Sequence, residues 1–239
     1  MHDWKTIQLT RDYLDGVRGG IPLAATQIEL IIRLVRAWRP DLRTFVDLGC
    51  GDGILGRQLF GYWPESKGIF IDYSEPMMQA AREKGKDIVS VTEYYLLDYR
   101  EKTWRNSLSH ALPVDVVISG FSIHHLEDDQ KYRVYQDIFE ILRPGGIFLN
   151  LEHVASRDQY IEKVFDEVFT DGLYEYHQNH NASITRQEIM DKYYKREDKI
   201  LNKLTLVEIQ CDWLREIGFL HVDCFFKLFE LALFGGVRP

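Results

Sequence analysis

The chain has 239 residues, 45% of them hydrophobic, and a formal net charge of -8 at pH 7. This length can bury a sizeable core in one domain, and the composition excludes a largely disordered chain. The acidic balance argues against a nucleic-acid partner and favours a small molecule.

The cysteines and the apolar runs exclude several further classes. Cys50, Cys211 and Cys224 lack the spacing of a disulfide framework or a zinc site. No apolar run reaches the roughly 18 residues of a membrane helix, and the first residues lack the apolar segment of a secretion signal. We therefore expect a cytoplasmic protein with no metal and no membrane partner, and a homodimer stays open.

The first elements along the chain are a helix and a strand that ends in glycines. Apolar residues at positions 28, 31, 32 and 35 recur at helical spacing, and Pro40 ends that helix. Residues 45–48 then predict a buried strand, and the glycines at 49, 51 and 53 allow a sharp turn into the next helix. Asp47, at the end of the strand, favours a ligand with a positive charge over one with phosphates.

Two further strands are predicted to end at acidic residues. Residues 68–71 form a strand ending at Asp72, one strand-helix-strand unit beyond the glycines, and a right-handed crossover places Asp72 beside them. A carboxylate there can accept hydrogen bonds from both hydroxyls of a ribose. A third strand, residues 94–97, ends at Asp98 and Tyr99.

The fourth predicted strand leads to a pair of histidines. Residues 116–118 are wholly apolar, and the small residues Ser119 and Gly120 let a ligand approach the strand end. Ligands gather outside the carboxyl ends of such strands, so residues 119–125 are expected to line a cavity. A helix from Asp128 or Asp129 follows, and a fifth strand, residues 147–151, brings Glu152 and His153 to the same edge.

The last third of the chain departs from this repeat before returning to it. Residues 154–203 combine a helix at 159–169, a stretch rich in Tyr, His and Asn at 172–183, and a charged helical pattern at 185–201. They predict an inserted helical lid that binds a second small molecule, the acceptor of a transferred group, or else a solvated helical hairpin. A helix around 206–217 and two strands, 221–228 and 230–234, predict an antiparallel pair at one sheet edge.

Residues 47–53, Asp-Leu-Gly-Cys-Gly-Asp-Gly, resemble motif I of the class I S-adenosylmethionine (SAM) dependent methyltransferases, and residues 119–125 resemble their motif IV. The resemblance implies an α/β, Rossmann-like single domain over residues 1–239. Its seven-stranded, mostly parallel sheet has the order 3-2-1-4-5-7-6, with strand 7 antiparallel and helices on both faces. The implied cofactor is SAM, covered by the N-terminal segment of residues 1–25.

The resemblance also implies site residues. Those assigned to SAM are Arg18, Asp47, Gly49, Cys50, Gly51, Gly53, Asp72, Tyr73, Met77, Asp98, Tyr99 and Ser119. Arg18 is the candidate for the methionine carboxylate, with a solvated loop position as the alternative, and Met77 packs on adenine or belongs to the core. His124 and His125 are the catalytic candidates, as a general base or an orienting group, and a structural role for each stays open. Weaker candidates are Glu152, His153, Tyr176 and His177.

The expected function is SAM-dependent methyl transfer to a small or medium-sized acceptor molecule. Motif IV lacks the Asn/Asp-Pro-Pro-aromatic pattern of the enzymes that methylate amino groups in nucleic acids. Two alternatives stay open. Residues 213–227 are similar to the end of carboxy-SAM synthases, which modify SAM itself for tRNA wobble-uridine synthesis, and a non-catalytic SAM-binding sensor or partner protein would need the same cofactor site.

Overall fold

The computed structural model describes residues 17–88, 90–180, 183–194 and 201–239. In these residues seven strands form one sheet in the order β3-β2-β1-β4-β5-β7-β6. The strands are β1 (Thr44–Leu48), β2 (Lys67–Asp72), β3 (Thr92–Leu96), β4 (Val114–Gly120), β5 (Leu142–His153), β6 (Leu220–Leu228) and β7 (Leu231–Val237). Strands β1 to β5 run parallel, whereas β7 is antiparallel to both β5 and β6. The predicted sheet order and the antiparallel strand are confirmed.

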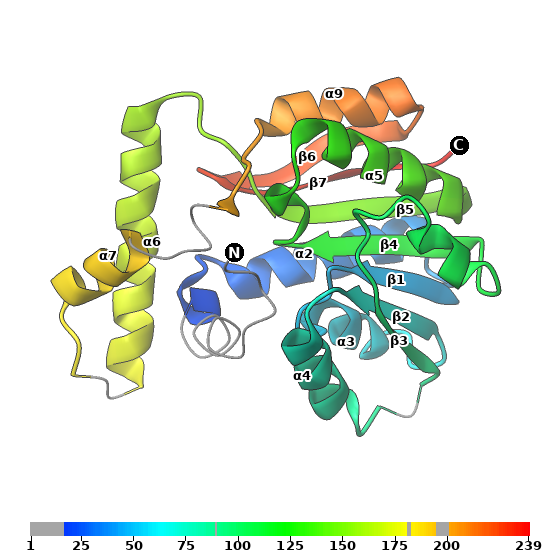
Figure 1. Cartoon of the computed structure of the whole chain (residues 1–239), viewed down its shortest axis with the longest axis horizontal. Coiled ribbons are helices and arrows are strands. Elements are labelled where there is room, and N and C mark those ends of the chain that lie inside the picture. Colours follow the sequence, from blue (N-terminus) through cyan, green and yellow to red (C-terminus); the bar gives the residue numbers. More distant parts are fainter. Residues whose placement is uncertain (1–16, 89, 181–182, 195–200) are drawn as a thin grey trace.

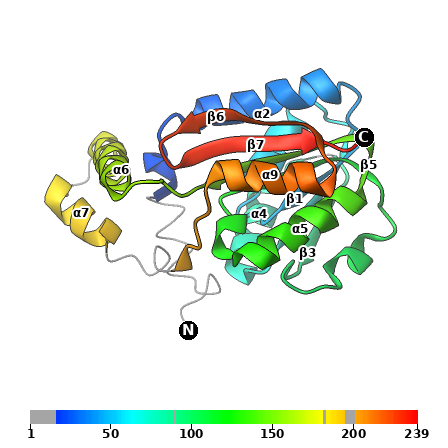
Figure 2. The same cartoon turned by 90° about the horizontal axis from the view of Figure 1, so that it is seen from above.

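Helices cover both faces of the sheet. The α-helices are α2 (Ala24–Trp38), α3 (Ile54–Phe60), α4 (Glu75–Gly85), α5 (Asp128–Ile141), α6 (Gln159–Asn179), α7 (Arg186–Tyr194) and α9 (Val207–Ile217), and the short 3-10 turns are η1 (Val17–Gly20), η2 (Trp104–Leu108) and η3 (Ile123–His125). Seen from above, the strands separate α2 from α5 and α9 (Figure 2). None of the helices described is long and apolar enough to cross a membrane.

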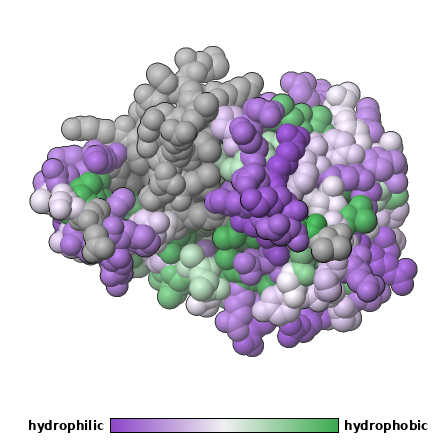
Figure 3. Space-filling view, turned by 90° about the horizontal axis from the view of Figure 1, so that it is seen from below, coloured by the Kyte–Doolittle hydropathy of each residue, from purple (hydrophilic) through white to green (hydrophobic). Residues whose placement is uncertain are grey.

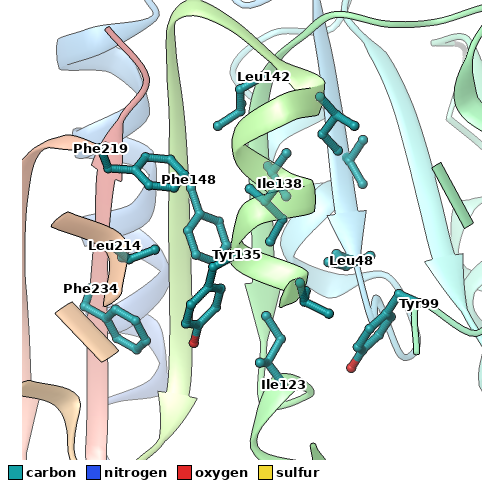
Figure 4. Close-up of a cluster of buried hydrophobic side chains, with 14 of the residues drawn as sticks. Leu48, Tyr99, Ile123, Tyr135, Ile138, Leu142, Phe148, Leu214, Phe219 and Phe234 are labelled. Atoms are coloured by element: carbon teal, nitrogen blue, oxygen red, sulfur yellow. The ribbon is translucent and has the colours of Figure 1, made fainter. Parts of the chain in front are cut away.

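The core on the α5 and α9 face is built around one aromatic side chain. Tyr135 of α5 lies between Phe148 of β5 and Phe234 of β7, with ring centroids 5.5 and 6.4 Å away (Figure 4). Its hydroxyl donates to Gln210 Oε1 at 2.6 Å and accepts from Asn150 Nδ2 at 3.3 Å. The buried polar tip is therefore paired and reaches α9, and the aromatic body joins α5 to two strands.

The amino-terminal edge of the parallel strands is fixed by a buried carboxylate. Asp115, near the start of β4, is fully buried and accepts from the backbone N–H groups of Arg43 and Thr44 at 2.9 Å each. The guanidinium groups of Arg39 and Arg143 flank it. This cluster holds α2, β1, β4 and β5 together at the edge of the sheet opposite the carboxyl ends of the parallel strands.

The carboxyl ends of the parallel strands face η1 and α6. Figure 1 shows the β4 arrow pointing toward α6, and the other parallel strands end on the same side. Helix α6 continues through residues 172–179, beyond the predicted helix at 159–169. Phe165, Phe169 and Leu173 recur every four residues and give α6 one buried stripe that ends at Leu173.

Candidate active site

The turn after β1 exposes bare backbone. Gly49, Gly51 and Gly53 have φ angles of +67°, +55° and +76°, which side chains disfavour. A Cβ at Gly49 would lie 1.9 Å from Ser122 Oγ, whereas at Gly51 the nearest atom would be Met77 Sδ at 3.9 Å. The turn is therefore closed on the Ser122 side and leaves room for a ligand beside Gly51.

Two buried carboxylates lie beside this turn. Asp47 Oδ2 accepts from the Gly56 N–H at 2.9 Å, and burial raises the pKa of Asp47 to about 8. Asp72 Oδ2 accepts from Gly51 N at 2.8 Å and Oδ1 from Ser74 N at 2.8 Å, and burial raises the pKa of Asp72 to about 6. Such groups fit a ligand with a positive charge and hydroxyls, because each contact would repay part of the cost of burying a carboxylate.

A cavity over the carboxyl edge of the sheet brings most of the predicted site residues together. Its lining includes Asp47, Gly49, Cys50, Gly51, Asp72, Tyr73, Met77, His124 and His125. The cofactor candidates come from β1, β2 and α4, whereas the histidines follow β4. The sheet order therefore spreads the cavity sideways across several strand ends.

Other predicted residues stand behind or beside this lining. Gly53 precedes α3, Ser119 Oγ donates to Leu48 O at 2.7 Å, and the Tyr99 hydroxyl contacts Ser122 Oγ at 2.6 Å. Asp98 is half-buried and pairs with Arg100, with Nη2 2.6 Å from Oδ2. The side chain of Arg18 lies outside the described residues. The cofactor roles of all five stay predictions.

A buried glutamate organises the histidines. Glu152 Oε1 lies 2.5 Å from His124 Nδ1, and its carboxylate accepts the N–H groups of His124 at 3.1 Å and His153 at 3.0 Å. The ring of His124 is 4.0 Å from that of His125 and 5.8 Å from that of His153, between centroids. Burial raises the pKa of Glu152 to about 7.

A second imidazole and carboxylate pair lies next to the first. His153 Nε2 is 2.8 Å from Glu230 Oε2, and Asn202 Nδ2 is 3.4 Å from His153 Nδ1. His153 and Asn202 line the cavity, and Glu230 is buried behind them. The sequence analysis missed Glu230 and Asn202, because neither lies in a periodic pattern.

The rest of the cavity wall is largely apolar. It includes Ile21, Phe121, Leu151, Phe165, Phe169 and Leu231. Hydrophobic residues also show at the surface between the sheet and the end of the molecule that holds α6 and α7, which is at the left of Figure 3.

Gln27 of α2 lines the cavity as well, and its position four residues before Ile31 placed a polar group on the buried stripe. A polar residue in an otherwise apolar helical stripe was therefore the sequence signal that could have identified Gln27 as a site residue.

The acidic and histidine side chains of the site do not form a metal centre. Across the described residues, no group of three or more His, Cys, Asp or Glu is arranged to hold a metal ion. The buried carboxylates are instead paired with imidazoles or with backbone N–H groups.

Comparisons with known proteins support one family. Residues 45–146 match the methyltransferase domain family. Carboxy-S-adenosyl-L-methionine synthases from Campylobacter lari and Wolinella succinogenes are 24% and 27% identical, and each alignment covers 92% of this chain and 88% or 87% of the relative. An O-methyltransferase family protein from Burkholderia thailandensis shares the fold, with a TM-score of 0.60 at 16% identity over 89% of this chain, which spans 57% of that protein.

The matched region contains the glycine turn, Asp72 and the paired histidines, so it includes one part of the cavity lining, whereas Gln27, His153, Phe165 and Asn202 lie outside it. The sheet order agrees with the fold of the structural relative. Residues 45–146 of this chain are therefore similar to the methyltransferase domain family, and the chain has the fold of the O-methyltransferase family protein.

Proposed function

We propose that this chain transfers the methyl group of SAM to a small acceptor molecule bound among the histidines and phenylalanines of the cavity. One observation carries the proposal: a single cavity is lined both by the glycine turn with Asp72 and by the imidazoles of His124, His125 and His153. A cofactor and an acceptor can therefore meet at one sheet edge.

The cofactor half would hold SAM through groups already in place. Asp72 has carboxylate lone pairs left for ribose hydroxyls after accepting two backbone N–H groups. A positively charged ligand would favour the ionised form of Asp47, whose pKa burial raises, and the open space beside Gly51 admits the amino-acid end. When bound, SAM supplies an already electrophilic methyl group. The remaining tasks of the protein are to align the nucleophile and to exclude water.

The acceptor half carries groups that can take up a proton. His124 contacts Glu152 through Nδ1, so its imidazole has a carboxylate that would stabilise the protonated form, whereas both ring nitrogens of His153 already face Glu230 and Asn202. A hydroxyl or amine acceptor bound against the ring of His124 would lose its proton there as its oxygen or nitrogen attacks. The apolar wall around them limits access of water.

The test measures binding and turnover separately. Calorimetry with S-adenosylhomocysteine should show saturable binding to the pure protein. Incubation with SAM and a panel of phenols, amines, thiols and carboxylic acids should then give S-adenosylhomocysteine and a methylated product by mass spectrometry. Absence of binding would sink the proposal, and tight binding without turnover on any panel member would favour the sensor.

A second candidate is carboxy-SAM synthesis, because those relatives align with 92% of this chain. In that case the second molecule in the cavity would modify SAM rather than accept its methyl group. Incubation with SAM and prephenate separates the two reactions. A product heavier than SAM by one carboxyl group supports this candidate, whereas unchanged SAM with prephenate and methylation of a panel compound supports methyl transfer.

A further inference from the structure

Gln27 presents a buried hydrogen-bond acceptor that has no partner in residues 17–88, 90–180, 183–194 and 201–239. The residue is 1% exposed and lines the cavity, and its Nε2 donates to the Pro22 carbonyl at 2.7 Å. A carbonyl can only accept, so the NH₂ group must face Pro22. Oε1 is then left on the other side of the amide, and among the described residues it has no hydrogen-bond partner. A buried amide oxygen in this state is costly unless a ligand supplies a donor.

Asn202 presents a second such oxygen from another part of the chain. Glu230 can only accept from His153 Nε2, which leaves Nδ1 of the neutral ring as an acceptor for the Asn202 NH₂ group. Asn202 Oδ1 is buried, and no hydrogen-bond partner for it lies in the part of the chain that the structure describes. The neighbouring Lys203 N–H donates to the His124 carbonyl at 2.8 Å, which holds this segment against the histidines.

The side-chain amides of Gln27 and Asn202 are therefore oriented in the same way. In each, a protein acceptor fixes the NH₂ group, and the oxygen remains for something else in or beside the cavity. A carboxylate ligand would bring only lone pairs to these oxygens and to the carboxylates of Glu152 and Glu230 behind the histidines. A ligand with O–H or N–H groups would satisfy both oxygens.

We propose that Gln27 Oε1 and Asn202 Oδ1 determine acceptor specificity by accepting hydrogen bonds from a neutral ring compound that carries at least two O–H or N–H donors. This inference rests on the proposed function, since it describes the molecule that shares the cavity with SAM. The ring follows from the wall of Phe121, Phe165 and Phe169, which offers flat apolar contact. Gln27 and Asn202 act here as specificity residues, and His153 is a positioning residue that orients Asn202.

The experiment compares ring probes of similar size in the presence of saturating S-adenosylhomocysteine. The probes are catechol, which has two donors, 1,2-dimethoxybenzene, which has none, and benzoate, which is an anion. Calorimetry should show catechol binding at least about tenfold more tightly than the other two, the expected size of one or more buried hydrogen bonds. Equal or tighter binding of benzoate or dimethoxybenzene overturns the inference.

Two variants locate the effect. Gln27→Met and Asn202→Leu should each weaken catechol binding about tenfold and leave the affinity for 1,2-dimethoxybenzene unchanged. S-adenosylhomocysteine binding, measured first, reports that each variant is folded. If Gln27→Met weakens S-adenosylhomocysteine instead of catechol, the amide serves the cofactor and the inference is wrong. If the wild-type protein does not bind S-adenosylhomocysteine at all, the proposed function fails first, which keeps the two failures apart.

Discussion

Asp72 and Gly51 are joined by a hydrogen bond of 2.8 Å between the carboxylate Oδ2 and the backbone N–H, which ties the end of β2 to the glycine turn after β1. The other oxygen of Asp72 accepts from Ser74 N at 2.8 Å, at the start of α4. One side chain thus sets the spacing of three segments around the cavity. The same contacts orient its remaining lone pairs for a ligand.

Replacing this carboxylate should weaken cofactor binding. In Asp72→Asn one oxygen becomes an NH₂ group, so the side chain must lose either a backbone contact or an acceptor for the ribose. We expect an affinity for S-adenosylhomocysteine about tenfold lower by calorimetry. The exposed carboxylate of Glu75, in the first turn of α4, supplies the control Glu75→Gln, which should bind as the wild type does. Equal loss in both variants would refute a specific role for Asp72.

Much of this arrangement was predictable from the sequence. Asp47, the glycines and Asp72 lie at ends of buried apolar strands, and the right-handed crossover leaves little freedom in where those ends meet. Periodicity therefore led to the strands and to the cofactor half of the cavity, whereas the full sheet order came from the resemblance to the class I methyltransferases. The paired histidines were found for the same reason, because they follow a wholly buried strand.

The acceptor half was less predictable because its residues come from segments that only tertiary packing brings together. Phe165 and Phe169 lie on α6, and their helical spacing says that one face is buried but not against what. Asn202 and Glu230 carry no periodic signal, and their contact with His153 joins three distant parts of the chain. Nor could the sequence show that Asp98 pairs with Arg100 beside the cavity.

The buried Asp47 should make stability depend on pH. Its pKa of about 8 in the folded protein lies above the ordinary value of 3.8, so folding favours the protonated form. This contribution to stability is fully present below about pH 4 and is lost as the pH rises to about 8. In Asp47→Asn the dependence is absent. The melting temperature of the variant minus that of the wild type should therefore become more positive between pH 4.5 and 8, and then level off. A difference that is constant with pH would contradict the prediction.

Replacing Asp115 should lower the stability of the fold and leave the affinity for the cofactor unchanged. Asp115→Asn removes the buried charge that faces Arg39 and Arg143 at the amino-terminal edge of the sheet. We expect the free energy of unfolding in urea to fall by about 3 kcal/mol, the size typical of breaking a buried ion pair. Cofactor affinity should not change. Asp41 lies 4.0 Å from the same Arg39 but is 65% exposed, so Asp41→Asn should cost less than about 1 kcal/mol.

The last prediction concerns Glu152, whose carboxylate accepts the backbone N–H of His124 and contacts Nδ1 of the His124 ring. Glu152→Gln keeps the shape of the side chain but removes the charge that would stabilise a protonated imidazole. Once an acceptor is known, we expect kcat to fall about a hundredfold, within the range typical of general acid-base catalysis. Binding of S-adenosylhomocysteine should stay within about twofold, less than 1.4 kcal/mol of affinity.

The pH profile distinguishes this role from a structural one. Burial raises the pKa of Glu152 to about 7, so the wild-type kcat should rise as the pH passes through that value and the pair loses its proton. In Glu152→Gln that rise should move to lower pH, because the imidazole of His124 then loses its proton without a carboxylate to stabilise the protonated form. The exposed Glu216 of α9 supplies the control Glu216→Gln, for which rate and profile should match the wild type. A variant at Glu152 that is slower but keeps the wild-type profile would show that the carboxylate only holds the loop of His124 in place.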